Sequence, residues 1–202
     1  MKQSTGSVRE DILYAAEQLI LDAGLGAATT RAIAKAAGCA EGSIYRHFPD
    51  KHALVVEVVK TCFPDFIAML CALPDRVGTG TVVQNLEELG TVALDFYRDI
   101  VPIAAGVMSD QDLLAKNQAS FKATETGPTQ ALDAVTNYLI QEQRLGRVSE
   151  HVSAGYGARM ILGTFFSQAF LEELSGDGPG DKESDARMVR GVAEMIWRAL
   201  EP

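Results

Sequence analysis

Hydrophobic positions along this chain recur with the spacing of an α-helix almost from end to end. The first stripe places apolar residues at i, i+3, i+4, i+7 and i+8, and it consists of Ile12, Ala15, Ala16, Leu19 and Ile20. Such a stripe predicts a helix with one buried face, and Gly24 is a residue type that commonly ends one. No segment alternates cleanly between hydrophobic and polar positions as a half-buried strand would. The pattern therefore predicts an all-α fold.

Three shorter helices are expected to follow the first. Thr29 or Thr30 is placed to cap the second helix, and Gly38 is placed to stop it. The third helix is expected over 41–48 and the fourth from Lys51 to about Cys62. The N-terminal 60 residues are therefore expected to form one small helical domain.

The remaining residues, 61–202, are expected to form a second helical domain, which brings the total to about nine helices. Pro64, Pro74 and the run Gly78–Thr79–Gly80 mark the passage into it. Its helices are expected at about 81–105, 110–121, 128–145, 150–174 and 182–200. Gly127–Pro128 places a proline at the start of one of them. The glycine-rich run 176–180 follows a helix and lacks a phosphate-loop motif, so a turn is expected there.

Charge is distributed unevenly over the 202 residues. The formal net charge is −9, yet residues 1–60 hold seven Lys and Arg against seven acids, and the remaining 11 bases and 20 acids lie in 61–202. A neutral, locally basic head is compatible with a small electrostatic footprint on DNA. No run approaches the roughly 20 apolar residues of a membrane span, and the N-terminus lacks a signal-peptide core. A soluble, cytoplasmic protein is therefore expected.

The residues that carry catalysis or bind metals are sparse. Three cysteines have no CxxC spacing, and His47, His52 and His151 form no HExxH pattern. GxSxG, SxxK and P-loop motifs are absent. We therefore expect no enzyme, no metal and no cofactor, and we expect His52 to be solvated.

The informative stretch is 29–51, T-T-R-A-I-A-K-A-A-G-C-A-E-G-S-I-Y-R-H-F-P-D-K. Two short helices joined by a glycine-containing turn, at about 29–48, predict a helix-turn-helix, whose second helix enters the major groove of DNA. Ile44 and Phe48 are expected to anchor that helix on the core. The opposite face carries small residues and side chains that bond phosphate oxygens, namely Gly42, Ser43, Tyr45, Arg46 and His47.

At this point residues 9–59 resemble the TetR family of bacterial transcriptional regulators. The resemblance lies in I-L-x-A-A-x-x-L-I-x-x-x-G over 12–24, in T-T-R-A-I-A-K-A-A-G over 29–38 and in E-G-S-I-Y-R-H-F-P-D-K-H-A-L over 41–54. The combination is specific, whereas residues beyond 60 match only in the layout of helices. The implied fold is a three-helix helix-turn-helix domain followed by a helical domain for ligand binding and dimerisation.

The resemblance implies DNA-contacting roles for individual residues, with some near bases and others on phosphates. They are Thr29, Thr30, Arg31, Glu41, Gly42, Ser43, Tyr45, Arg46, His47 and Lys51. Ala40 departs from the family, which usually has Ser or Thr there, and such a lost cap costs about 1 kcal/mol. Glu41 could accept a hydrogen bond from a cytosine amino group or merely offset the helix dipole; the structural role is favoured.

The resemblance also implies a homodimer through helices at about 150–174 and 182–200, and a pocket for a small molecule. The pocket candidates are Phe63, Phe66, Met69, Leu70, Phe96, Tyr97, Ile100, Met108, Phe121, Tyr138 and Phe166. Their apolar character favours a hydrophobic effector, although acids such as Glu142 could recognise a cation. The expected function is a repressor that leaves a palindromic operator when the effector binds. The alternative is a helical protein-interaction module that has lost operator binding.

Overall fold

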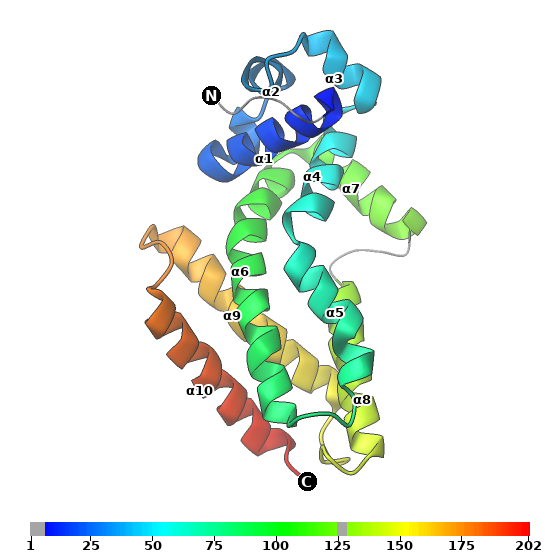
Figure 1. Cartoon of the computed structure of the whole chain (residues 1–202), viewed down its shortest axis with the longest axis vertical. Helices are drawn as coiled ribbons and strands as arrows, with labels where there is room; N and C mark the ends of the chain where they lie inside the picture. The colour runs from blue at the N-terminus through cyan, green and yellow to red at the C-terminus, as the bar shows by residue number, and fades with distance from the viewer. Residues whose placement is uncertain (1–6, 125–128) are drawn as a thin grey trace. The chain divides into compact units, whose positions relative to one another are not determined.

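A computed structural model describes residues 7–124 and 129–202, with the side chains of 59–62 and 124 left out. The described residues form ten α-helices and no strand (Figure 1), which confirms the predicted fold class. The helices are α1 (Val8–Ala27), α2 (Thr30–Ala36), α3 (Glu41–His47), α4 (Lys51–Cys62), α5 (Pro64–Arg76), α6 (Val82–Ser109), α7 (Gln111–Thr124), α8 (Thr129–Arg144), α9 (Ala154–Ser175) and α10 (Lys182–Leu200).

The helix beyond the expected nine is α5. Both of its prolines are compatible with a helix, although the sequence suggested only a break there. Pro64 occupies the first position, where the missing N–H is not needed, and Pro74 lies in the last turn. Gly127–Pro128, expected to start a helix, lies outside the described residues. None of the described helices combines the length and apolar composition that crossing a bilayer requires.

The chain forms two compact units. The first contains residues 1–64 together with 102–124, and the second contains residues 65–101 together with 125–202. The boundary falls inside α6 at Pro102, so this helix contributes to both units. The functional division into 1–60 and 61–202 remains a prediction.

The core of the first unit follows the predicted stripes. Ile12, Ala16 and Ile20 of α1 are buried, as are Ile33 of α2 and Ile44 of α3. Two glycines shape the chain around these helices, because Gly24 has a φ of 78° inside α1 and Gly38 a φ of 68° after α2. Positive φ is reached at little cost only by glycine. Gly38 follows the end of α2 as predicted, whereas Gly24 kinks α1, which continues to Ala27 and so ends later than predicted.

The last part of α6 approaches α1 closely at another glycine. A Cβ added to Gly106 would lie 2.6 Å from the Leu25 Cβ, and Leu25 is buried. We predict that Gly106→Ala lowers the free energy of unfolding by about 1–3 kcal/mol, because a packed backbone must shift. Gly26→Ala in the same unit, where a Cβ meets nothing within 4 Å, is the matched control. Denaturant unfolding measures both variants, and equal stability would contradict the close approach.

The second unit is a helical bundle in which α8 packs on α9 and α9 on α10. Figure 1 shows α9 and α10 side by side, joined by the short connection after Gly176. Gly176 has a φ of 73° and ends α9, so the predicted turn is confirmed. Ser153 starts α9 by accepting a hydrogen bond from the Tyr156 amide. The helix therefore begins later than the predicted residue 150.

An ion network ties three helices of this unit together. The Arg98 guanidinium of α6 bonds both oxygens of Glu172 on α9, at 2.7 and 2.8 Å, and both oxygens of Asp185 on α10, at 2.6 and 2.9 Å. Gln168 also donates to Glu172. These hydrogen bonds to Arg98 lower the pKa of Glu172 and of Asp185 and raise that of Arg98. No pattern in the sequence marks this cluster, because its members lie far apart along the chain.

Candidate functional site

The two helices of the predicted helix-turn-helix are positioned by local signals. The Thr29 hydroxyl accepts a hydrogen bond from the Ala32 amide at 3.1 Å, which makes Thr29 the N-cap of α2. Ala40 occupies the same position before α3 and offers no side-chain cap. The structure therefore decides between the two candidate threonines and confirms that α3 lacks a cap of this kind.

The third helix presents a polar face to solvent. Ile44 and Phe48 are buried, and the Arg9 guanidinium lies over the Phe48 ring, 5.2 Å from its centroid. The other residues of α3 are exposed, apart from half-buried Ser43; they are Glu41, Gly42, Tyr45, Arg46 and His47. The arrangement leaves a phenol, a guanidinium and an imidazole available to an external partner.

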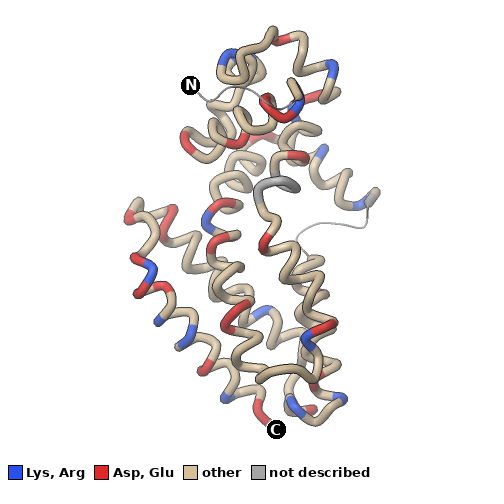
Figure 2. The backbone as a smooth tube through the Cα atoms, viewed as in Figure 1, with Lys and Arg blue, Asp and Glu red and all other residues tan. Residues whose placement is uncertain are grey.

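Exposed cations accompany this face. Arg31 and Lys35 on α2 and Arg46 on α3 are exposed, and none of them forms an ion pair with a described residue. Figure 2 marks the charged positions of the chain. Cations without an internal partner can neutralise phosphates, and this neutralisation supplies much of the affinity of proteins for DNA.

Lys51 and its neighbour Asp50 have partners within the same unit. Lys51 Nζ donates to the Leu25 carbonyl at 3.0 Å, which leaves two of its three ammonium hydrogens for an external acceptor. Asp50 caps α4 through the Ala53 amide and pairs with Lys116 of α7 at 3.0 Å. The hydrogen bonds that Asp50 accepts from the Ala53 amide and from Lys116 lower its pKa.

His52 differs from the sequence-based expectation of a solvated side chain. It is half-buried, and its Nε2 is buried without a hydrogen-bond partner in the part of the chain that the structure describes.

Several pocket candidates meet in the second unit as a row of aromatic rings. This aromatic row consists of Phe66 on α5, Phe96 and Tyr97 on α6, and Phe166 and Phe170 on α9. The Phe66 and Phe96 rings stack at 4.2 Å between centroids, and the Tyr97 and Phe166 rings meet edge to face at 5.6 Å. Burial raises the pKa of Tyr97 to about 12. Phe166 and Phe170 are each 45% exposed, so one end of the aromatic row reaches solvent.

The remaining pocket candidates are more scattered. In the second unit Met69 is buried, and Leu70 and Ile100 are half-buried. Phe63, Met108 and Phe121 belong to the first unit, where Met108 is exposed.

Tyr138 and Glu142, two polar candidates of the second unit, have internal partners. The buried Tyr138 hydroxyl accepts a hydrogen bond from Asn85 at 3.0 Å, and burial raises its pKa. Glu142 is fully buried, accepts from the Gly78 amide at 3.1 Å and lies 3.2 Å from Arg147 Nε. Arg147 therefore supplies an internal cation for Glu142, although Glu142 Oε2 is buried without a hydrogen-bond partner in the part of the chain that the structure describes.

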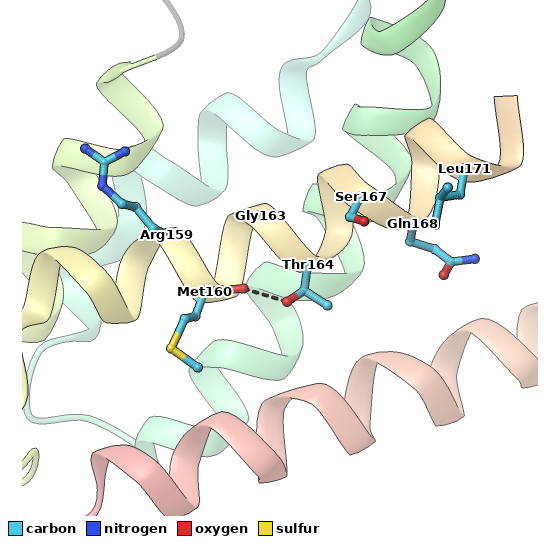
Figure 3. A pocket seen from close by; sticks show the side chains of 7 residues that line it. All are labelled: Arg159, Met160, Gly163, Thr164, Ser167, Gln168 and Leu171. Atoms are coloured by element: carbon cyan, nitrogen blue, oxygen red, sulfur yellow. Dashed lines mark hydrogen bonds between the residues drawn. The ribbon is translucent and has the colours of Figure 1, made fainter. Parts of the chain in front are cut away.

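The outer face of α9 carries an open groove. Its volume is about 410 Å³ and its lining consists of Arg159, Met160, Gly163, Thr164, Ser167, Gln168 and Leu171 (Figure 3). Met160, Thr164, Ser167 and Leu171 follow the i, i+4, i+7, i+11 spacing of one helix face, and Met160 and Leu171 are exposed. A helix that is buried on one side and exposes large apolar side chains on the other is typical of an interface.

Two sets of contacts have no counterpart in the sequence-based predictions. One is the Arg98 network; the other is a hydrogen bond of 2.6 Å from the Thr30 hydroxyl to the Glu41 carboxylate. Spacing along the chain carries no signal for either contact. Among the described residues, no group of three His, Cys, Asp or Glu side chains could hold a metal ion.

Comparison with known sequences places the matched region over this motif. A family model described as bacterial regulatory proteins, tetR family, matches residues 12–58. The chain is 33% identical over 106 residues to the HTH-type transcriptional repressor KstR2 of Mycolicibacterium smegmatis, covering 52% of this chain and 49% of that protein. It is 39% identical over 97 residues to the repressor BepR of Brucella suis, covering 48% and 46%. The matched region spans about half the length of both relatives.

The fold as a whole also has a solved counterpart. A putative TetR-family transcriptional regulator from Mesorhizobium loti superimposes with a TM-score of 0.72 over 100% of both chains, at 15% sequence identity. At this identity the likeness concerns the fold alone.

Proposed function

We propose that the chain is a DNA-binding transcriptional regulator of the tetR family of bacterial regulatory proteins, whose family model matches residues 12–58, and that its effector binds the second unit. The observation that carries this proposal is the face of α3. Ile44 and Phe48 hold the helix on the core, while Tyr45, Arg46 and His47 are exposed together. The proposed mode of regulation is repression, in which the protein leaves a palindromic operator when the effector binds.

Some of the proposed contacts fix the position of the protein on the DNA, and others recognise the base sequence. Tyr45, His47 and Lys51 donate to phosphate oxygens, and these contacts fix the position of α3. Thr29 joins them, because a hydroxyl that accepts the capping bond keeps its own hydrogen for a phosphate. Gly42, Ser43 and Arg46 lie at the base edges in the major groove, where side chains distinguish base pairs.

A homodimer through α9 and α10 would supply the two-fold symmetry that a palindromic operator requires. The groove on α9 supports it, together with the exposed apolar residues Tyr156, Met160, Leu174 and Met195. A second copy of this face would remove them from water. The operator half-sites would then be read by two copies of α3.

Leu171→Glu tests this interface. The substitution buries an unpaired carboxylate in the proposed dimer, and we expect the dimer dissociation constant to rise by about 30-fold or more. Leu145→Glu is the matched control, since Leu145 is 55% exposed, Leu171 is 56% exposed, and only Leu171 lies on α9. Analytical ultracentrifugation compares the two variants. Equal dissociation constants would argue against α9 as the interface.

The proposed effector is a hydrophobic, aromatic small molecule that binds at the aromatic row. Rings from α5, α6 and α9 offer faces and edges for stacking, and apolar pockets with few polar groups favour such ligands. In a panel of planar aromatic compounds, a binder is expected to raise the unfolding temperature and to release operator DNA. Phe166→Ala is expected to remove both effects, whereas Leu145→Ala retains them.

Selection of bound fragments from the genomic DNA of the source organism tests the regulatory function as a whole. Two preparations of the purified protein are used, one as isolated and one refolded to remove any bound effector. At about 100 mM salt, at least one of them is expected to enrich a two-fold symmetric sequence. Lack of enrichment in both preparations would overturn the proposal and would favour a protein-interaction module.

A further inference from the structure

The adjacent threonines at the start of α2 have different partners. Thr29 caps its own helix through the Ala32 amide. Thr30 instead donates across the motif to Glu41 Oε1 on α3, at 2.6 Å. A hydroxyl has one hydrogen to donate. Thr30 therefore has no hydrogen left for a phosphate while this bond holds, and the phosphate role expected for it falls to Thr29.

The Glu41 carboxylate is oriented by a residue of α2 and not by its own helix, α3. Ala40 provides no side-chain cap for α3, and the Glu41 carboxylate is attached to Thr30. Among the described residues, Oε2 of Glu41 makes no hydrogen bond, and neither Arg31 nor Arg46 forms an ion pair with it. Glu41 is also exposed. An oriented acceptor therefore lies on the face that is proposed to meet DNA.

The chemistry of a carboxylate limits what it can bind on DNA. It only accepts hydrogen bonds, and its charge excludes the phosphates. In the major groove the hydrogen-bond donors are the exocyclic amino groups of cytosine and adenine. Glu41 therefore differs from every other exposed side chain of α3, since Tyr45, Arg46 and His47 can all donate to phosphates.

We propose that Thr30 and Glu41 form a specificity-determining pair, in which Thr30 orients the Glu41 carboxylate to accept a hydrogen bond from the amino group of a cytosine or adenine in each operator half-site. The inference rests on the proposed DNA-binding function. It assigns base discrimination to Glu41 and its orientation to Thr30. A purely structural role for Glu41 would affect all DNA sequences equally, whereas this role affects one base-pair position.

The experiment measures affinities of the full-length protein for its selected operator and for duplexes in which each base pair of a half-site is replaced in turn. The wild type is expected to prefer cytosine or adenine at one position by about tenfold or more. Glu41→Ala should reduce that preference to within about twofold, and Thr30→Val should weaken it severalfold. Glu41→Gln should shift it toward adenine, which glutamine binds through two hydrogen bonds. The base that the wild type prefers identifies the amino group.

Arg31→Gln is the control for a contact without base discrimination. It is expected to lower affinity for all duplexes by a similar factor and to reduce the slope of log K against log salt by about one. Unfolding temperatures of all variants establish that they fold. Glu41→Gln keeps a carbonyl acceptor for Thr30, so it remains informative if Glu41→Ala is unstable.

Two different results would contradict this inference, and they can be told apart. If Glu41→Ala kept every base preference and bound all duplexes more tightly by one factor, the carboxylate would only repel phosphates and the specificity role would be wrong. If the wild type itself selected no sequence, the DNA-binding function and the inference that rests on it would both be overturned.

Discussion

The double variant Tyr45→Ala/His47→Ala is expected to bind the operator about 100-fold more weakly than the wild type. In the proposed complex each side chain would supply one hydrogen bond to a charged phosphate oxygen, and two such bonds together are worth about 3 kcal/mol. Both residues are exposed, so the free energy of unfolding should change by less than about 0.5 kcal/mol. Fluorescence anisotropy with labelled operator measures the affinity.

Tyr14→Ala is the control for removing an exposed phenol from the same unit. Tyr14 is 65% exposed on α1 and Tyr45 is 55% exposed on α3, so the area lost is similar. Operator affinity should stay within about twofold of the wild type in this variant. An unchanged affinity of the double variant would contradict the assignment of α3 as the DNA-contacting helix.

Arg98→Met is expected to lower the free energy of unfolding by about 3 kcal/mol, because it leaves Glu172 and Asp185 close together without their cation. The side chains of Arg98 and Glu172 are only 14% and 12% exposed, so water screens the pair poorly. For a chain of this size the unfolding temperature should fall by roughly 6–12 °C. Arg187→Met is the control, since Arg187 and its partner Glu183 are both largely exposed and such pairs contribute little.

The same network predicts how stability depends on pH. Arg98 lowers the pKa of Glu172 and of Asp185 from ordinary values of 4.5 and 3.8. A carboxyl group with a lowered pKa stabilises the folded state above its ordinary value, and this contribution is lost as the pH falls through the folded-state pKa. Wild-type stability should therefore fall below about pH 5, and Arg98→Met should flatten this fall. Thermal unfolding from pH 3 to 7 measures both curves, and parallel curves would contradict the role of Arg98.

The helix-turn-helix was the part of the molecule most accessible from sequence. Its caps, its glycine turns and its buried residues are encoded within a few residues of one another. Thr29 bonds an amide three residues away, Gly38 has the positive φ that follows the end of α2, and Gly24 has the positive φ that kinks α1. The outcome at α5 shows the limit of such signals, because Pro64 is compatible with either a helix start or a break. Only packing of the apolar residues that follow decides between them.

The sequence alone determined the all-α class, most helices, the motif over 29–48 and the exposed face of α3, because helix periodicity and capping are local properties of the chain. The tertiary structure decided that residues 102–124 join the N-terminal unit, that Arg98 links α6 to α9 and α10, and that Thr30 holds Glu41. These contacts join residues between 11 and 87 positions apart. Their existence depends on how whole helices pack, which no local pattern of residues specifies.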